Sequence, residues 1–197
     1  MGKQKNKIVI ATNNIGKLKE IKEILKDYEF FTLKDLNCNV EINEDGKTFE
    51  ENSLKKAKEI SKILQMPCIA DDSGLCIEQL KGFPGVNTAR FLGENATQED
   101  RNNDLIKRLK GKTNRKALFI TVITYFDERM GNIITSRGTL EGYISKEKRG
   151  TNGFGFDEIF ELKDGRTLAE LTDEEKNKIS SRKIALENLK MNLEKML

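Results

Sequence analysis

The alternation of strand-like and helix-like segments along the first half of the chain is the feature that most restricts its fold. A β-branched run at residues 7–12 is followed by residues 15–25, in which the apolar side chains recur at the helical period. A second strand-like run lies at residues 30–33. Strands that alternate with helices indicate an α/β sheet with helices packed against it.

The next two segments continue this alternation. Thr48 and Glu51 have the spacing of a capping box, which predicts a helix from Thr48 to about Gln65. Pro67 then restarts the chain as a strand. Further helices are expected at residues 98–109 and in the tail from about Thr172.

Two long β-rich runs in the second half make the predicted sheet mixed rather than all parallel. Residues 117–126 and 132–144 are joined by the short segment "DERMGN", which predicts a hairpin. With 197 residues and no evident linker, the chain is long enough for one sizeable domain. We therefore expect a single α/β domain with a mixed β-sheet flanked by helices.

The charge balance and the lack of long apolar runs exclude two classes of partner. The 35 lysines and arginines barely outnumber the 32 aspartates and glutamates, which does not predict a face that binds nucleic acid. No apolar run approaches the roughly 20 residues that span a bilayer, so no membrane partner is expected.

The chain has no histidine, and this restricts its chemistry. Ser-His-Asp and Cys-His nucleophilic sites are excluded, as is any metal site built from imidazole. Any catalysis must use carboxylates, lysines, hydroxyls, backbone groups or a metal ion held by oxygen atoms.

The segment "ATNNIGKLKE" turns from a strand directly into a helix. The N-terminus of a helix presents unpaired backbone N–H groups and favours anions. Thr12, Asn13 and Asn14 add side-chain donors there, and Lys17 adds a positive charge. A P-loop does not fit, because Ala11 and Leu18 replace residues that the motif requires. The alternative interpretation is an ordinary capped start of a helix.

Two adjacent carboxylates, Asp71 and Asp72, follow the apolar run "CIA". Ionised carboxylates are costly to remove from water unless they are paired or bind a metal. In a chain without histidine, such a pair suits a hard cation such as Mg²⁺. The alternative is a turn, since Asp-Ser-Gly is favourable in turns; a turn does not explain the doubled aspartate.

A third group of residues lies near the C-terminus, in "TNGFGFDEIF" and in the helical pattern that contains Arg182. The glycines around Phe154 and Phe156 allow an aromatic ring to lie flat against the backbone, and aromatic faces stack on nucleobases. For Arg182 the alternative is a solvated side chain on an amphipathic helix.

Together these segments resemble the inosine triphosphate pyrophosphatases, which hydrolyse ITP, dITP and XTP. The likeness lies in five blocks that span nearly the whole chain in the order of that family: "ATNNIGKLKEI", "TFEENSLKKA", "IADDSGLCIEQLKGFPGVNTARF", "GFGFDEIF" and "AELTDEEKNKISSR". The resemblance implies one pyrophosphatase domain over residues 1–197, with an elongated mixed sheet, two lobes and a nucleotide cleft between them. It also implies a homodimer that acts on the cytoplasmic nucleotide pool.

The resemblance assigns roles to individual residues. Asp72 corresponds to the proton acceptor and, together with Glu44, to a ligand of Mg²⁺, with Mn²⁺ as the alternative metal. Ser73 corresponds to a substrate contact, and Lys56 to a contact with the triphosphate. Lys176 and Arg182 correspond to residues that close over the nucleotide. The phosphate-binding turn is assigned to Thr12, Asn13, Asn14, Ile15, Gly16 and Lys17, and the base-binding segment to Phe154, Gly155, Phe156 and Asp157.

One position departs from the family pattern and leaves some choices open. The family usually has Ser-His-Arg where this chain has Ser180, Ser181 and Arg182. The contact that the family's histidine makes with the base or sugar therefore differs in this chain, where Ser181 takes its place. Whether Asp71 or Asp72 is the base is also open. The alternative functions are a pyrophosphatase directed to pyrimidine nucleotides and a nucleotide-binding sensor without hydrolysis.

Overall fold

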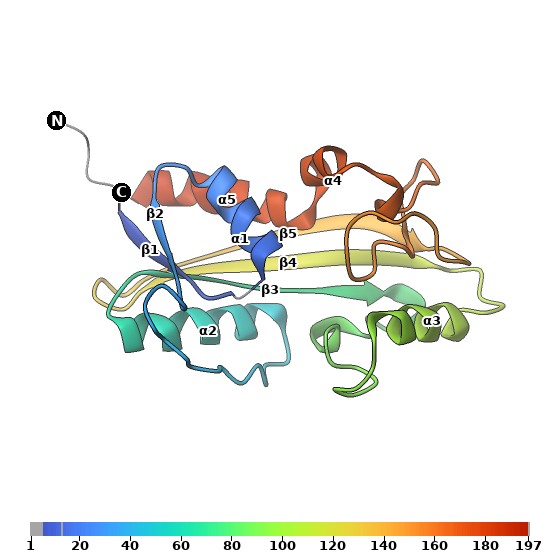
Figure 1. The fold of residues 1–197 in the computed structure, drawn as a ribbon, viewed down its shortest axis with the longest axis horizontal. Helices are drawn as coiled ribbons and strands as arrows, with labels where there is room; N and C mark the ends of the chain where they lie inside the picture. The colour runs from blue at the N-terminus through green and yellow to red at the C-terminus, as the bar shows by residue number, and fades with distance from the viewer. Residues whose placement is uncertain (1–5, 13, 197) are drawn as a thin grey trace. The chain divides into compact units, whose positions relative to one another are not determined.

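The computed structural model describes residues 6–12 and 14–196, and its strands form one six-stranded sheet in the order β2-β1-β3-β4-β5-β6 (Figure 1). The strands are β1 (Lys7–Ile10), β2 (Glu29–Thr32), β3 (Cys68–Ile77), β4 (Lys116–Asp127), β5 (Asn132–Ile144) and β6 (Phe160–Glu161). Strand β1 is parallel to both β2 and β3, whereas β5 and β6 are antiparallel. The predicted mixed sheet is confirmed.

The chain divides into two compact units. Unit 1 comprises Met1–Asp72, Thr121–Gly138 and Arg182–Leu197, and unit 2 comprises Ser73–Ile120 and Thr139–Ser181. Strands β3, β4 and β5 therefore each contribute residues to both units.

In unit 1, helices cover both sides of the strands (Figure 1). Helices α1 (Ile15–Ile24) and α5 (Ser181–Met196) pack on one side, where Ile21 and Leu189 share an apolar cluster with Ile10 of β1. Helix α2 (Phe49–Leu64) packs on the other side through residues such as Ile60, which contacts Val9 and Cys68. The burial of apolar side chains on both faces explains why residues 8–10 of β1 and residues 68–70 of β3 are all apolar.

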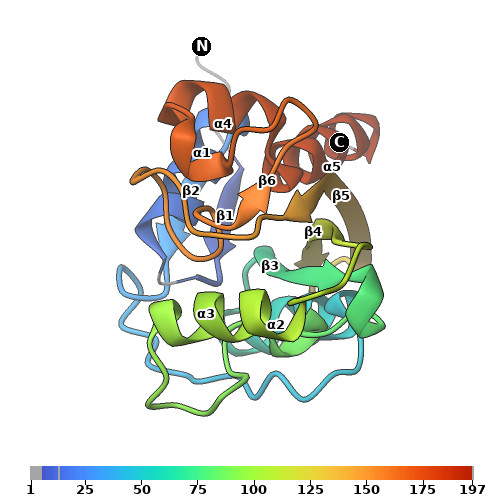
Figure 2. The same ribbon diagram turned by 90° about the vertical axis from the view of Figure 1, so that its right-hand side faces the viewer.

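In unit 2, the apolar core lies between α3 (Gln98–Arg108) and the segment that carries β6 and α4 (Asp173–Ile179). Figure 2 shows this part of the molecule from its end, with α3 on one side of the strands and α4 on the other. Leu105 of α3, Ile77 of β3 and Phe160 of β6 are fully buried in this core. Three short 3-10 helices, at Glu78–Leu80, Gly85–Asn87 and Leu168–Glu170, also belong to unit 2.

One alternative interpretation and one local prediction differ from the structure. The stretch that contains Asp71 and Asp72 is not a turn but the middle of the continuous strand β3, because backbone pairing with neighbouring strands overrides the turn preference of Asp-Ser-Gly. The helical tail is also interrupted. Ser180 has an extended backbone (φ −62°, ψ 144°) and separates α4 from α5, in keeping with the preference of serine for the boundary of a helix.

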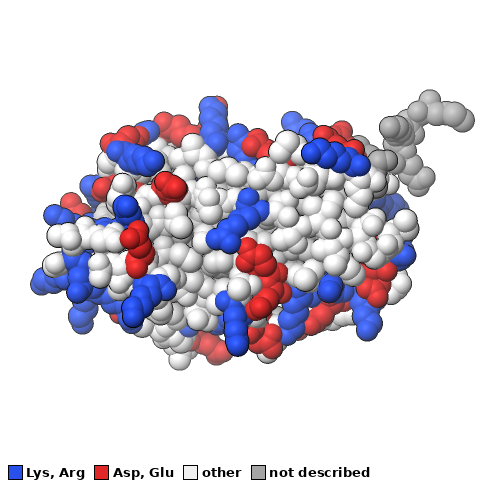
Figure 3. Space-filling view, turned by 180° about the vertical axis from the view of Figure 1, so that it is seen from behind, with Lys and Arg blue, Asp and Glu red and all other residues white. Residues whose placement is uncertain are grey.

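Among the described residues, no helix is both long and apolar enough to cross a membrane. On the face shown in Figure 3, positively and negatively charged side chains are interspersed. This agrees with the near-neutral charge balance of the sequence.

Candidate functional site

The loop between β1 and α1 carries the predicted phosphate-binding turn. Asn14 caps α1: its Oδ1 atom accepts a hydrogen bond from the backbone N–H of Lys17 at 3.2 Å. The Thr12 hydroxyl accepts a hydrogen bond from the backbone N–H of Asn14, also at 3.2 Å. Asn13 lies outside the described residues. The structure therefore has a capped helix start directly after β1, and the predicted phosphate contacts of this turn stay a prediction.

Asp71 of β3 lies at the centre of a buried group of charges in unit 1. The Nζ atom of Lys17 lies 2.8 Å from Asp71 Oδ2, and Nε of Arg182 lies 3.6 Å from the same oxygen. Arg182 Nη1 lies 3.3 Å from a carboxylate oxygen of Glu20. Lys17, the predicted phosphate contact, and Arg182, which was predicted to close over the nucleotide, thus share the carboxylate of Asp71.

These positive charges determine the ionisation of Asp71. Burial raises the pKa of its carboxyl, but the charges of Lys17 and Arg182 outweigh this effect and bring the pKa to about 2. A carboxylate with so low a pKa is a weak proton acceptor near neutral pH. Asp71 is therefore held as the ionised partner of Lys17 and Arg182.

A pocket of about 370 Å³ opens beside this group of charges. Its lining includes Thr12, Lys17, Glu44, Lys56 and Asp71, all of which belong to unit 1. Within it, Lys56 Nζ of α2 donates to Glu44 Oε1 at 2.6 Å. The pocket thus joins three predicted phosphate contacts to one predicted metal ligand.

Asp72, the next residue of β3, is buried and is held by Asn52 of α2. Asn52 Nδ2 donates a hydrogen bond of 2.9 Å to Asp72 Oδ2. Burial raises the pKa of Asp72 above its ordinary value, and the negative charges of Glu44 and Asp71 act in the same direction. A raised pKa brings a carboxylate closer to the range in which it accepts a proton from water.

The donor set suits a hard divalent cation. Glu44 and Asp72 supply carboxylate oxygens, and the repulsion from Glu44 that raises the pKa of Asp72 is what a bound cation would relieve. Within the described part of the chain, no three His, Cys, Asp or Glu side chains gather closely enough to hold a metal by themselves.

Unit 2 holds the predicted base-binding segment. Phe154 is 55% exposed, and Lys176 Nζ lies 4.3 Å from the centre of its ring. Asp157 Oδ2 accepts hydrogen bonds from the backbone N–H of Phe154, at 2.8 Å, and from Lys176 Nζ. One face of the ring is therefore in contact with a cation whose position is fixed by a buried carboxylate.

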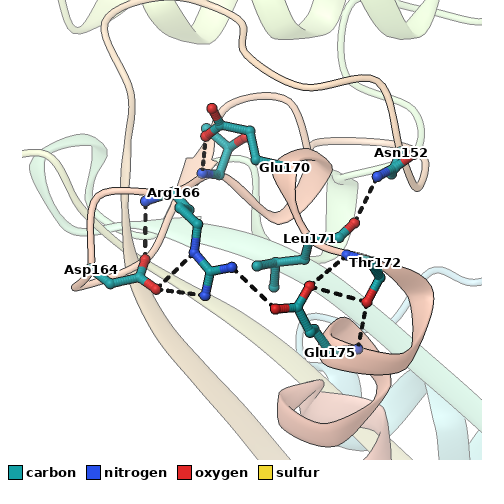
Figure 4. A network of polar contacts seen from close by, with 8 residues as sticks. Asn152, Asp164, Arg166, Glu170, Leu171, Thr172 and Glu175 are labelled. Carbon is teal, nitrogen blue, oxygen red and sulfur yellow. Dashed lines mark hydrogen bonds and ion pairs between the residues drawn. The ribbon is translucent and has the colours of Figure 1, made fainter.

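The helix that carries Lys176 is itself fixed by a polar network (Figure 4). Arg166 binds Asp164 and also donates to Glu175, the residue before Lys176. Glu175 forms a capping box with Thr172 at the start of α4. On the neighbouring loop, Asn152 Nδ2 donates to the backbone carbonyl of Leu171 at 2.8 Å. These contacts tie the Phe154 loop to α4.

The other predicted residues lie in various positions. The Phe156 ring is buried in the unit 2 core, where it stacks on the Phe91 ring with 6.2 Å between the ring centres. Of the two phenylalanines in the predicted base-binding segment, Phe154 is therefore the exposed one. The carbonyl of Gly155 accepts from Asn102 Nδ2 at 3.2 Å. Ile15 and Gly16 are exposed in the first turn of α1, Ser73 is half-buried in β3, and Ser181 is buried at the start of α5.

The sequence analysis missed Asn52 and the partners of Arg182. A signal for Asn52 exists, because Phe49, Asn52 and Ile60 lie on the buried face of α2. A polar residue on the apolar face of a predicted helix needs a hydrogen-bonding partner. No comparable signal identifies Glu20, since its contact with Arg182 joins residues 162 positions apart.

This fold and these residues define a class: an α/β protein with a capped helix start after its first strand, paired lysines and carboxylates beside a pocket, and an exposed aromatic ring. The chain belongs to the Ham1 family, whose sequence profile matches residues 8–192. The resemblance inferred from the sequence is confirmed.

Individual relatives cover nearly the whole chain. A dITP/XTP pyrophosphatase of Thermoanaerobacter sp. (strain X514) is 48% identical over 93% of this chain and 94% of its own length. A dITP/XTP pyrophosphatase of Bacillus subtilis (strain 168) is 44% identical over 94% of this chain and 96% of its own. The solved structure of the Staphylococcus aureus Ham1 protein has a TM-score of 0.91 at 38% identity and covers 98% of this chain and 100% of that chain.

Proposed function

We propose that this chain hydrolyses the triphosphates of deaminated purines, namely ITP, dITP and XTP, to the monophosphate and pyrophosphate. The observation that carries this proposal is the 48% identity, over 93% of the chain, to a dITP/XTP pyrophosphatase. The pocket that joins Lys17, Lys56 and Glu44 supplies the charges that a triphosphate requires. In the proposal, which treats residues 1–197 as one pyrophosphatase domain, Lys17 and Lys56 contact the phosphates and the segment from Phe154 to Asp157 contacts the base.

In the proposed reaction, a water oxygen forms a bond to the α-phosphorus, and the bond between that phosphorus and the oxygen bridging to the β-phosphorus breaks. Pyrophosphate leaves with the bridging oxygen, and Asp72 accepts the proton of the attacking water. Lys17, Lys56 and the N–H groups of α1 hold the phosphate oxygens. Positioning and charge neutralisation are the main contributions in such reactions.

The metal in this proposal is Mg²⁺, with Mn²⁺ as the alternative, held by Glu44 and Asp72. When bound, the cation neutralises charge on the phosphate oxygens. Because Lys56 pairs with Glu44 at 2.6 Å, the two side chains are placed to exchange this contact for phosphate and metal respectively.

In this proposal the base stacks on Phe154, beside Lys176, which Asp157 holds in place. The guanidinium group of Arg182 forms hydrogen bonds with the edge of the base. Hypoxanthine and xanthine have two neighbouring acceptors, the C6 carbonyl and N7, which match a guanidinium fork. Adenine presents an amino group at C6, so a donor would face a donor. A homodimer in the cytoplasm also forms part of the proposal, and sedimentation of the purified protein would test the dimer.

Hydrolysis of ITP in ¹⁸O-labelled water tests the reaction directly. We expect inosine monophosphate and pyrophosphate as products, with the label in the monophosphate because water attacks the α-phosphorus. Label in released inorganic phosphate would show attack at the γ-phosphorus and would contradict the proposal. A protein that binds ITP without forming products would be a sensor.

A further inference from the structure

Asn52 is a fully buried amide on the face of α2 that packs against the sheet. Its two polar atoms serve two different segments of unit 1. Oδ1 accepts a hydrogen bond of 2.8 Å from the backbone N–H of Gly46, and Nδ2 donates one of 2.9 Å to Asp72 Oδ2. One side chain thus ties the turn that follows Glu44 to the strand that carries Asp72.

The chemistry of the partners requires an amide at this position. A backbone N–H can only donate, and an ionised carboxylate can only accept, so the middle group must offer one acceptor and one donor. Aspartate has the same shape but lacks the donor, and leucine lacks both. Asparagine alone among side chains of this length provides both groups.

The turn approaches α2 as closely as glycine allows. A Cβ atom added at Gly46 would lie 2.6 Å from Asn52 Oδ1 and 2.9 Å from the Cβ atom of Glu51. On its other side the turn is fixed by Glu51, whose carboxylate accepts hydrogen bonds from the backbone N–H groups of Lys47 and Thr48. The segment directly after Glu44 is therefore anchored to the first turn of α2.

We propose that Asn52 is a positioning residue that fixes the placement of Glu44 relative to Asp72. The inference rests on the proposed function, in which these two carboxylates hold the divalent cation. Two carboxylates repel each other, and although Lys56 offsets part of this repulsion, a side chain that holds both segments acts as a tether. The Asn52 amide supplies that tether by holding the Glu44 turn and Asp72 at once, so that both are in place before the cation arrives.

The test compares three variants with the wild-type chain. Asn52→Ala removes both hydrogen bonds, and Gly46→Ala keeps the amide but displaces it from the turn. Ser53→Ala is the matched control: Ser53 is equally buried on the same helix, but its hydroxyl pairs with Thr124 at 2.8 Å instead of with the turn. For each protein we would measure unfolding in urea, Mn²⁺ binding by electron paramagnetic resonance, and the Mg²⁺ concentration that gives half-maximal hydrolysis of ITP.

We expect Asn52→Ala and Gly46→Ala to weaken Mn²⁺ binding and raise the half-maximal Mg²⁺ concentration, each roughly 10- to 100-fold, as residues that orient metal ligands do. The KM for ITP at saturating Mg²⁺ should change far less. Ser53→Ala should lower the unfolding free energy and leave both metal constants at their wild-type values.

Two results would overturn the inference. One is an equal change of the metal constants in Asn52→Ala and Ser53→Ala, which would make Asn52 a purely structural residue. The other is wild-type metal constants in Gly46→Ala, which decides the matter even if Asn52→Ala does not fold. If the wild-type chain released no pyrophosphate from ITP, the proposed function would fail, whereas the Mn²⁺ measurements would still decide the role of Asn52.

Discussion

The two units of the chain place lysine–carboxylate pairs in different surroundings. Unit 1 places charged pairs around a pocket, with Lys17 against Asp71 and Lys56 against Glu44. Unit 2 places one pair, Lys176 and Asp157, against an exposed aromatic ring. A cluster of paired charges matches the phosphates, which are the same in every nucleotide. A ring with a fixed cation matches the base, which differs between nucleotides.

This contrast implies that rate and selectivity are carried by different residues. Substitutions at the charge pairs of unit 1 should slow hydrolysis of every nucleotide equally. Substitutions at groups that touch the base should change the ratio between nucleotides. Each variant below tests on which side of this division a residue falls.

The largest effect is expected at Asp72. Asp72→Asn should lower kcat by roughly 10²- to 10⁴-fold for every nucleotide, because the variant has lost the proposed base and a metal ligand. The fold should survive, since the oxygen of the new amide still accepts the hydrogen bond from Asn52. Steady-state kinetics with excess Mg²⁺, together with a melting curve, would check this. Near-normal activity would remove Asp72 from the mechanism.

The next effect concerns Lys56. A charge-assisted contact with a phosphate contributes on the order of 1.5–3 kcal/mol, so Lys56→Ala should lower kcat/KM roughly 10- to 100-fold. The loss should be the same for ITP and ATP, because both have the same triphosphate. Lys55→Ala is a suitable control, since Lys55 is the neighbouring lysine and pairs with the exposed Asp45. A loss of kcat/KM that depended on the base would assign Lys56 to the residues that set selectivity.

Arg182 provides the strictest test of the division between residues that set the rate and residues that set selectivity. Its contacts with Asp71 and Glu20 place it in unit 1, yet we propose that it reads the base. Arg182→Ala should narrow the ratio of kcat/KM between ITP and ATP about tenfold or more, from the 1–3 kcal/mol of a guanidinium fork. Ser181→His should alter the ratio much less. If Arg182→Ala instead slowed both nucleotides equally, Arg182 would act only on Asp71 and the phosphates.

The smallest effect concerns stability and pH. Because the pKa of Asp71 falls from its ordinary value to about 2 on folding, its ionised form stabilises the folded state by about 2 kcal/mol. This contribution is complete above about pH 4, the ordinary carboxylate pKa, and is lost as the pH falls toward 2. Asp71→Asn should therefore destabilise the protein most near pH 7 and least near pH 2. Urea unfolding across this range measures the difference, and a constant difference would show that Asp71 is not held ionised by its partners.

Much of the fold follows from local sequence patterns. The capping box of Thr48 and Glu51 predicted the start of α2, and the structure contains both of its hydrogen bonds. The β-rich runs and the short connection between them predicted β4 and β5 to within one residue at each end. These features depend on residues close together in the chain, so the sequence alone was sufficient to predict them.

The remainder depends on contacts between distant segments. The turn preference around Ser73 was overridden by strand pairing, which single-sequence patterns do not reveal. The acidic pair was recognised, but the different environments of its members were not. Asp71 faces Lys17 and Arg182, whereas Asp72 faces Asn52, and each of these partners comes from another segment.

The most direct test of the account is pyrophosphate release by the wild-type chain from ITP, dITP, XTP, ATP, GTP and the pyrimidine triphosphates, each at saturating Mg²⁺. The account predicts that kcat/KM for ITP, dITP and XTP exceeds that for all the others. It also predicts that EDTA abolishes release from every nucleotide. Equal rates with ATP and ITP, or a preference for pyrimidine triphosphates, would contradict it.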